Sequence, residues 1–532
     1  GLGDDLFLVL AADHGESLGE HQETLHGFFV YQAAIHVPLI VVTPFPELRG
    51  VVSPETVTLT DILPTVCEMT GLPVPAEVQG RSLVPELFRP GALPDRLAYA
   101  ETYYPRYHYG WSELRSVQDG RFKLIVAPVP ELYDLAADPG ESKNLVYLEK
   151  DVYEDLSARA AAFMEEAGRN ALEVGMQNID EETREKLAAL GYVGSFQDPA
   201  KLQGRRLADP KDKIGIFNEL TRAREAGLSG DPEEAIRTIR AIIAEDPTIS
   251  DAHFSLGNVL SRARRFDEAI EAFRKSLDLK PDDSFCVINI ANAYQATGRF
   301  DEAEAFVLDY LARGFEDAQL YFLLGNIKVH AKETDKAVGY FEKCLEGNPR
   351  SASAHNALAA LYLNRDAGGD LALAERHLDA AAAINPTLTS VRYNQAQLRE
   401  RQGRLPEAAD LYLREIEDSP RAYKALFNLS RVYRLLGRQD DEYATLMRTI
   451  EAEPEFPVAY FYAARVLLLR GRDLEEAVRL AERGIGLRPA PSELALGYFL
   501  LADLHNRLGD HARSAEYAAK GRAAAEAAKG KG

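Results

Sequence analysis

The sequence predicts part of an α/β domain followed by an all-α array of helical repeats, and three observations carry this prediction. Residues 1–150 alternate short apolar runs with loops rich in Gly, Pro and aromatic residues, as α/β domains do. Residues 213–529 are helical in pattern and repeat with a fixed period. Between these regions, residues 151–193 have a helical pattern, and residues 194–212 have the Gly, Pro and charge content of a linker.

The bulk properties limit the classes of function. A chain of 532 residues exceeds a single core, so we expect at least two domains. Its 61 basic against 83 acidic side chains give a net charge of −22, which argues against a nucleic-acid partner. The cysteines have neither disulfide-framework nor metal-ligand spacing. No run of 18 apolar residues is present, so no membrane segment is expected within the chain.

The first apolar run, residues 6–12, predicts a central parallel strand that is buried on both faces. It leads into Asp13, His14, Gly15 and Glu16. Ligands of open α/β sheets bind beyond the carboxyl ends of strands. A carboxylate and an imidazole at that position indicate half of a divalent-metal site, with His14 suited to zinc or manganese. A helix-capping Asp13 in an ordinary loop is the alternative.

The rest of the α/β region predicts a second buried strand, a capped helix and a hairpin. Residues 37–42 form the second apolar run, and Thr60 and Asp61 are expected to cap the helix that follows them. Residues 116–125 predict a β-hairpin with an Asp-Gly turn. The aromatic segment 99–111 either packs in the core beneath a covering loop, which we favour, or walls a substrate pocket.

The repeats follow from proline spacing. Seven prolines close successive units at intervals of 34, 68, 37, 34, 34 and 35 residues, and 68 is twice 34: Pro247, Pro281, Pro349, Pro386, Pro420, Pro454 and Pro489. A 34-residue period with helix–turn–helix content is the tetratricopeptide signature, here with about nine helix pairs. Gly257 and Gly325, like Ala291, Ala359 and Ala464 in the same phase, are expected where two helices cross closely.

The resemblance to tetratricopeptide proteins implies a superhelical solenoid with a concave groove for a protein or peptide partner. Six asparagines recur in two phases that this resemblance places on the groove: Asn258, Asn292 and Asn326, and Asn289, Asn394 and Asn428. An amide can bond both backbone groups of an extended peptide, so the ladder predicts a peptide clamp of low sequence preference. A chance recurrence of a common residue is the open alternative.

Residues 1–150 resemble the second half of the sulfatase family, within the alkaline phosphatase superfamily. The resemblance rests on motifs in family order, at residues 13–31, 35–42, 60–65, 80–83, 101–104, 111–115 and 131–145. It implies that Asp13 and His14 are metal ligands. It further implies that His26, thirteen residues after Asp13, contacts the transferred sulfate or phosphate. Calcium would favour an all-oxygen ligand set, whereas His14 permits manganese or zinc.

The family's nucleophile motif, Cys/Ser-x-Pro-x-Arg, which yields formylglycine, is absent from the sequence, as is its early pair of Asp ligands. We expect both upstream of residue 1, in a missing N-terminal half, and therefore expect this chain alone to be inactive. The parent protein is expected to be a sulfuric-ester hydrolase. The alternatives are a two-metal phosphodiesterase or phosphotransferase of the same superfamily, and a binding scaffold with an inactive hydrolase remnant. The family resemblance implies that the parent protein acts in the cell envelope, in the periplasm or outside the cell, with a membrane anchor in the missing part.

Overall fold

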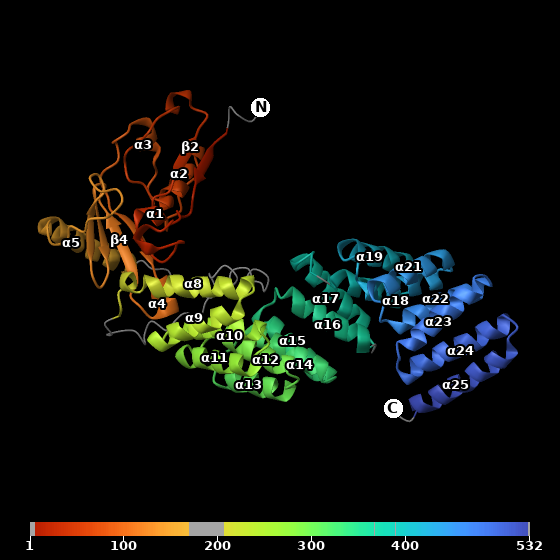
Figure 1. The fold of residues 1–532 in the computed structure, drawn as a ribbon. Coiled ribbons are helices and arrows are strands. Elements are labelled where there is room, and N and C mark those ends of the chain that lie inside the picture. Colours follow the sequence, from red (N-terminus) through yellow and green to blue (C-terminus); the bar gives the residue numbers. More distant parts are fainter. Residues whose placement is uncertain (1–5, 170–206, 366–367, 389, 530–532) are drawn as a thin grey trace. The chain divides into compact units, whose positions relative to one another are not determined.

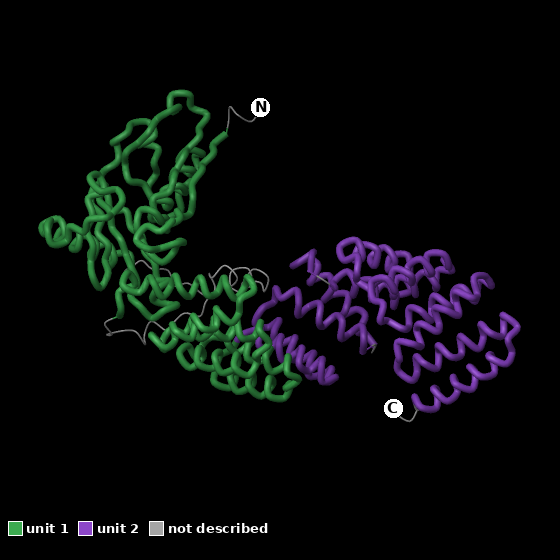
Figure 2. Tube along the Cα trace, in the orientation of Figure 1, with its two compact units in different colours: residues 1–316 green, residues 317–532 purple. Residues whose placement is uncertain are grey.

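The computed structural model describes residues 6–169, 207–365, 368–388 and 390–529 (Figure 1). The chain divides into two compact units, residues 1–316 and residues 317–532 (Figure 2). Unit 1 holds the described strands and the first helical repeats, and unit 2 holds helical repeats alone. Among the described residues, no helix is both long and apolar enough to cross a bilayer.

The first two strands form a small antiparallel sheet, which corrects the expectation of buried parallel strands. β1 (Leu8–Ala11) pairs with β2 (Leu39–Val42), with Leu8 opposite Val42. The side chains of Leu8 and Leu10 are 49% and 57% exposed. A parallel connection needs a crossover of a dozen or more residues, usually through a helix. The loop between these strands contains the 3-10 helix Glu20–Gln22 and the four-residue helix α1 (Gln32–Ile35), but no long crossover helix. The apolar pattern of β1 does not encode its direction.

A four-stranded antiparallel sheet follows, in the order β3 (Ala98–Thr102), β4 (Leu114–Gln118), β5 (Phe122–Val126) and β6 (Glu131–Asp134). The expected hairpin is confirmed, because β4 and β5 join at Asp119 and Gly120, and Gly120 has a φ of +98°. Helix α5 (Lys150–Arg169) packs Leu156 and Ala160 against Leu124 and Leu132 of the sheet.

Three short helices complete this region, and Asp61, which the sequence predicts as a cap, precedes the first of them. These are α2 (Ile62–Thr70), α3 (Val84–Phe88) and α4 (Tyr104–Tyr109). Asp61 occupies the N-cap position of α2, but its carboxylate accepts no N–H of that helix, which corrects the prediction. Instead, the fully buried carboxylate accepts the N–H of Thr58, in the capping box of the 3-10 helix Leu59–Asp61, and the N–H of Arg81, and it pairs with Arg96. The Thr60 hydroxyl contacts the Thr58 hydroxyl instead of a helix N–H.

The remaining helices come in consecutive antiparallel pairs. In unit 1 they are α8 (Ile214–Ser229), α9 (Pro232–Glu245), α10 (Ser250–Arg262), α11 (Phe266–Leu279), α12 (Ser284–Ala296) and α13 (Phe300–Ala312). In unit 2 they are α14 (Ala318–His330), α15 (Thr334–Gly347), α16 (Ala352–Arg365), α17 (Asp370–Ile384), α18 (Val391–Arg401), α19 (Leu405–Asp418), α20 (Tyr423–Leu435), α21 (Gln439–Ala452), α22 (Pro457–Arg470), α23 (Leu474–Gly486), α24 (Pro491–Arg507) and α25 (His511–Lys529).

The two helices of a pair cross closely where a glycine packs against an aromatic ring, as the sequence predicts for Gly257 and Gly325. A Cβ atom built on Gly257 would lie 2.5 Å from the ring of Phe273, and one built on Gly325 would lie 2.5 Å from the ring of Phe341. Both rings are fully buried, so neither has room to move aside. At the same phase, Ala359 is fully buried in a core cluster that also contains Leu378.

Gly325→Ala is expected to lower the free energy of unfolding by about 1–3 kcal/mol, because the added methyl group overpacks Phe341. Urea unfolding followed by circular dichroism measures the change. Gly339→Ala is the matched control, since Gly339 lies in α15 with open space around it. There, alanine is expected to stabilise the helix by up to about 1 kcal/mol. Equal stabilisation by both substitutions would contradict the close crossing.

Candidate metal site and its support

Three side chains meet just beyond the carboxyl end of β1. One donor atom from each of His14, Glu16 and His26 lies within 4.8 Å of the other two. The rings of His14 and His26 stack with their centroids 3.8 Å apart. His14 and His26 are partly buried, and Glu16 is exposed. Two imidazoles and one carboxylate form a donor set that suits zinc or manganese better than calcium.

Hydrogen bonds fix which ring nitrogens are available. Nδ1 of His14 lies 2.8 Å from the carbonyl oxygen of Gly15, which can only accept, so Nδ1 carries the proton. The Nε2 lone pair of His14 is then free for a ligand. Nδ1 of His26 lies 2.9 Å from a carboxylate oxygen of Glu16. Glu16 can therefore orient His26 as well as offer an oxygen of its own.

Asp13 lies beside this cluster without belonging to it. Its side chain is 89% exposed, and one of its oxygens accepts the backbone N–H of His14 at 3.1 Å. Its other oxygen is 3.8 Å from Nε2 of His14. The structure thus brings His14 and His26 together as candidate ligands with Glu16, a residue to which the sequence analysis assigned no role. The adjacency of Glu16 to the Asp-His-Gly motif was the available signal.

Close backbone packing positions His14 at the end of β1. The N–H of Gly15 donates to the carbonyl oxygen of Ala34 at 2.8 Å. A Cβ atom at Gly15 would lie 2.1 Å from the carbonyl oxygen of Ala33, so only glycine permits this approach of the loop to α1.

A buried carboxylate organises the loop between His14 and α1. Glu23 is fully buried, and it accepts the Ser17 hydroxyl at 3.1 Å and the N–H groups of Phe28 and Phe29 at 2.9 and 3.2 Å. Burial raises the pKa of Glu23, and these hydrogen bonds partly oppose the rise. These three hydrogen bonds bring Ser17 and Phe28 to the same carboxylate, which closes the loop that carries His26.

A second buried charge anchors α1 to the four-stranded sheet. Lys123 of β5 and Glu141 form an ion pair of 2.7 Å, with both side chains almost fully buried. Glu141 also accepts the N–H of Gln32, the first residue of α1, at 2.6 Å. Burial lowers the pKa of Lys123, and the negative charge of Glu141 opposes that shift. The sheet therefore supports the helix against which Gly15 packs.

The end of the aromatic segment lies in the core, as we favoured from its sequence, whereas Tyr99, Tyr103, Tyr104 and Tyr107 are half-buried. Tyr109 and Trp111 are 1% and 3% exposed, and their rings stack at 4.6 Å. Phe28 meets both rings edge-on. Burial raises the pKa of Tyr109 well above its usual value, as expected for a core side chain rather than a proton donor.

The six asparagines of the repeats differ in how deeply they are buried. Asn292 and Asn326 are exposed, and Asn258 and Asn289 are half-buried. Two are buried, and their amides serve the packing of unit 2. Asn394 donates to the side-chain oxygen of Asn356 at 2.8 Å, and Asn428 donates to the Tyr393 hydroxyl at 2.9 Å.

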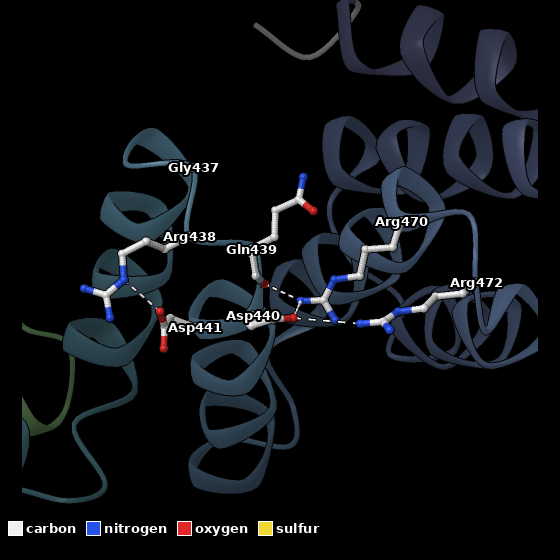
Figure 3. A pocket seen from close by; sticks show the side chains of 7 residues that line it. All are labelled: Gly437, Arg438, Gln439, Asp440, Asp441, Arg470 and Arg472. Atoms are coloured by element: carbon white, nitrogen blue, oxygen red, sulfur yellow. Dashed lines mark hydrogen bonds and ion pairs between the residues drawn. The ribbon is translucent and has the colours of Figure 1, made fainter.

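Unit 2 also has a polar pocket of about 590 Å³, lined by Gly437, Arg438, Gln439, Asp440, Asp441, Arg470 and Arg472 (Figure 3). Arg470 pairs with Asp440 at 2.9 Å, and Arg438 pairs with Asp441 at 2.7 Å. Similar pairs join successive repeats elsewhere in the two units, for example Arg299 with Asp267 and Arg365 with Asp335. Arg470 and Arg472 thus connect neighbouring repeats through Asp440, whereas the pair of Arg438 with Asp441 lies within one repeat.

Comparisons with known proteins match two kinds of region in the chain. A family model for the C-terminal region of N-sulphoglucosamine sulphohydrolase matches residues 19–168. Tetratricopeptide-repeat models match residues 220–284, 260–327, 318–350 and 393–448. The chain therefore contains a sulfatase-type C-terminal region joined to tetratricopeptide repeats.

Three curated relatives show how far the similarity extends. Over 150 residues the chain is 31% identical to a Delta 4,5-hexuronate-2-O-sulfatase of Bacteroides thetaiotaomicron, covering 27% of this chain and 31% of that protein. It is 32% identical over 155 residues to an N-acetylglucosamine-6-O-sulfatase of that organism (27% and 26% covered). It is 30% identical over 154 residues to Arylsulfatase K of Homo sapiens (26% and 27% covered). The chain spans less than a third of these relatives' length.

Lys123→Met is expected to lower the free energy of unfolding by about 3–5 kcal/mol, because it leaves the buried carboxylate of Glu141 without its cation. Chemical unfolding of the full chain measures this loss. Lys123→Met combined with Glu141→Gln is expected to recover part of it, since the double variant buries no unpaired charge. A loss below about 1 kcal/mol in the single variant, as surface pairs give, would show that the ion pair does not anchor α1.

Proposed function

We propose that residues 6–169 supply part of the metal and ester site of a metal-dependent sulfuric-ester hydrolase. The observation that carries the proposal is the convergence of His14, Glu16 and His26 beyond the carboxyl end of β1. The similarity to sulfatases over residues 19–168 supports the reaction class. The activity is proposed for a whole protein, because this chain spans less than a third of the length of these sulfatases.

The donor set fits a divalent metal with an open coordination position. Three protein ligands leave room for a water molecule or an ester oxygen, as in catalytic zinc sites. When bound, a divalent metal polarises the ester and stabilises the negative charge that develops on its oxygens. Asp13 becomes a fourth ligand if its exposed side chain rotates, since it is already 3.8 Å from Nε2 of His14.

The chain's own residues hold the two imidazoles in place. The carbonyl oxygen of Gly15 fixes the tautomer of His14, and Glu16 orients His26. In this arrangement we propose that His26 binds the metal through Nε2. The alternative, which the family resemblance implies, is a contact with the transferred group. Each role requires the ring position that Glu16 sets. A hydrogen-bond donor at that position stabilises charge on the sulfate oxygens.

A two-metal phosphodiesterase or phosphotransferase is the second candidate, and the nitrogen-rich donor set is the observation that favours it. Zinc, which imidazole ligands suit, is the metal of that alternative. Comparing hydrolysis of aryl sulfates and phosphate diesters by the parent protein distinguishes the two. For either reaction, we propose that the parent protein acts in the cell envelope or outside the cell.

Zinc or manganese is expected to bind the full chain with one ion per chain, and calcium is expected to bind more weakly. Isothermal titration calorimetry measures all three. Loss of an orienting partner alone costs 10–100-fold in affinity, so His14→Ala and His26→Ala are each expected to cost more than about 100-fold. His36→Ala is the control, because His36 is exposed and lies outside the cluster. A wild-type chain that binds none of the metals would contradict a metal site built from His14, Glu16 and His26.

The tetratricopeptide repeats indicate binding of a protein partner. We propose that Asn258, Asn289 and Asn292 of unit 1 contribute to a groove that holds an extended peptide. These three asparagines lie on α10 and α12, and none is fully buried. For unit 2 by itself, we propose that the exposed Asn326 of α14 has the same kind of role. Asn394 and Asn428 are already bonded internally and are proposed to support the groove wall rather than to contact peptide.

A peptide selected against the full chain by phage display provides the probe for this groove. Replacing Asn258, Asn289 and Asn292 together with Ala is expected to weaken its binding by about tenfold or more, because three hydrogen bonds contribute roughly 0.5–1.5 kcal/mol each. Fluorescence polarisation measures the affinity. Asn428→Ala is expected to lower stability instead. Unchanged affinity in the triple variant would contradict the clamp and leave the asparagines as common repeat residues.

A further inference from the structure

The loop that carries His26 is held by α8, the first helix of the repeat array. The side-chain amide of Asn218 donates to the carbonyl oxygen of Gln22 at 2.6 Å. The Thr24 hydroxyl donates to the amide oxygen of the same Asn218 at 3.4 Å. One amide thus bonds the loop at two points, four and two residues before His26.

The backbone at the first of these points is strained. His21 and Gln22 have φ angles of +51° and +67°, in the left-handed region that non-glycine residues rarely adopt. Such a conformation is unfavourable for a non-glycine residue and persists only where surrounding contacts hold it. Two contacts do so here, because the His21 ring stacks on Tyr31 at 3.5 Å and Asn218 binds the Gln22 carbonyl.

Two residues after His26, an aromatic contact joins the loop to the same helix. Phe28 is fully buried, and its ring stacks on that of Phe217 with the centroids 4.6 Å apart. Phe217 also meets Tyr104 and Tyr109 edge-on. His26 therefore lies between two attachments to α8, one polar and one aromatic.

A buried charge cluster fixes this helix and its neighbour α10 against the α/β region. Asp251 of α10 lies 3.0 Å from Nδ1 of His108 in α4, 3.1 Å from Nζ of Lys280 and 3.6 Å from Nη2 of Arg224 in α8. Burial alone would raise the pKa of Asp251, but Lys280, His108 and Arg224 hold it well below its usual value. Separating the two regions would leave these charges unpaired, which opposes independent movement.

We propose that α8 is a positioning element of the metal and ester site, with Asn218 and Phe217 acting through the loop that presents His26. The inference rests on the proposed function, and it extends that function by making the first repeat a structural part of the site. A partner bound to this repeat would then alter the metal affinity through the loop that carries His26. A tethered binding module joined by a free linker would have no such effect.

Asn218→Ala in the full chain tests the inference with two measurements. Hydrogen–deuterium exchange of the metal-free chain is expected to speed up at residues 22–28 by about tenfold or more, because the strained loop loses its polar attachment. Zinc affinity is expected to fall about tenfold, the lower end of the effect of losing an outer-shell support. Asn364→Ala, which changes an exposed asparagine of α16 instead, is the control. Phe217→Leu, which keeps an apolar side chain, provides a second variant.

The possible results distinguish the role of α8 from the proposed metal-dependent function. Faster exchange at residues 22–28 supports the role of α8 even if the wild-type chain binds no zinc, a result that would contradict the proposed function alone. Unchanged exchange in Asn218→Ala and Phe217→Leu overturns the inference. A wild-type chain that binds zinc, with variants that bind it equally well, also overturns it. A fall in affinity without a fall in the unfolding midpoint excludes general destabilisation as its cause.

Discussion

The need to satisfy the buried carboxylate of Glu23 is the constraint on which the candidate site depends. A buried carboxylate is tolerated only where hydrogen-bond donors surround it. Its donors are the Ser17 hydroxyl and the N–H groups of Phe28 and Phe29, which come from both ends of one loop. Closing that loop places His26 beside His14 and Glu16 and turns the Phe28 ring toward α8. One satisfied carboxylate thus links the site to the first repeat.

Local patterns predicted the features that depend on local physics. The 34-residue period, the glycines at the helix crossings and the Asp119-Gly120 hairpin all agree with the structure. Each is set by residues close in sequence, or by a repeat that imposes the same packing in every unit. The sulfatase-type motifs were also visible, and the family comparison supports them.

The features that the sequence did not reveal depend on distant residues. An apolar run at β1 is compatible with either strand direction, and only its pairing with β2 decides it. Asn394 has the same pattern as a groove residue, yet its amide bonds Asn356 of the preceding pair. The contact of Phe28 with Phe217 joins residues 189 positions apart, and no local pattern encodes it. The role of Glu16 emerged only when the loop brought His26 back to it.

The central claim is that His14, Glu16 and His26 bind one divalent metal on a loop supported by the repeats. Anomalous diffraction at the zinc absorption edge, from crystals of the full chain grown with zinc, tests this most directly. The account predicts a peak about 2.0–2.2 Å from a ring nitrogen of His14 and of His26, the usual zinc–ligand distance. The absence of a peak there, or a peak confined to another imidazole pair such as His355 and His377, whose Nδ1 atoms lie 2.8 Å apart, would contradict it.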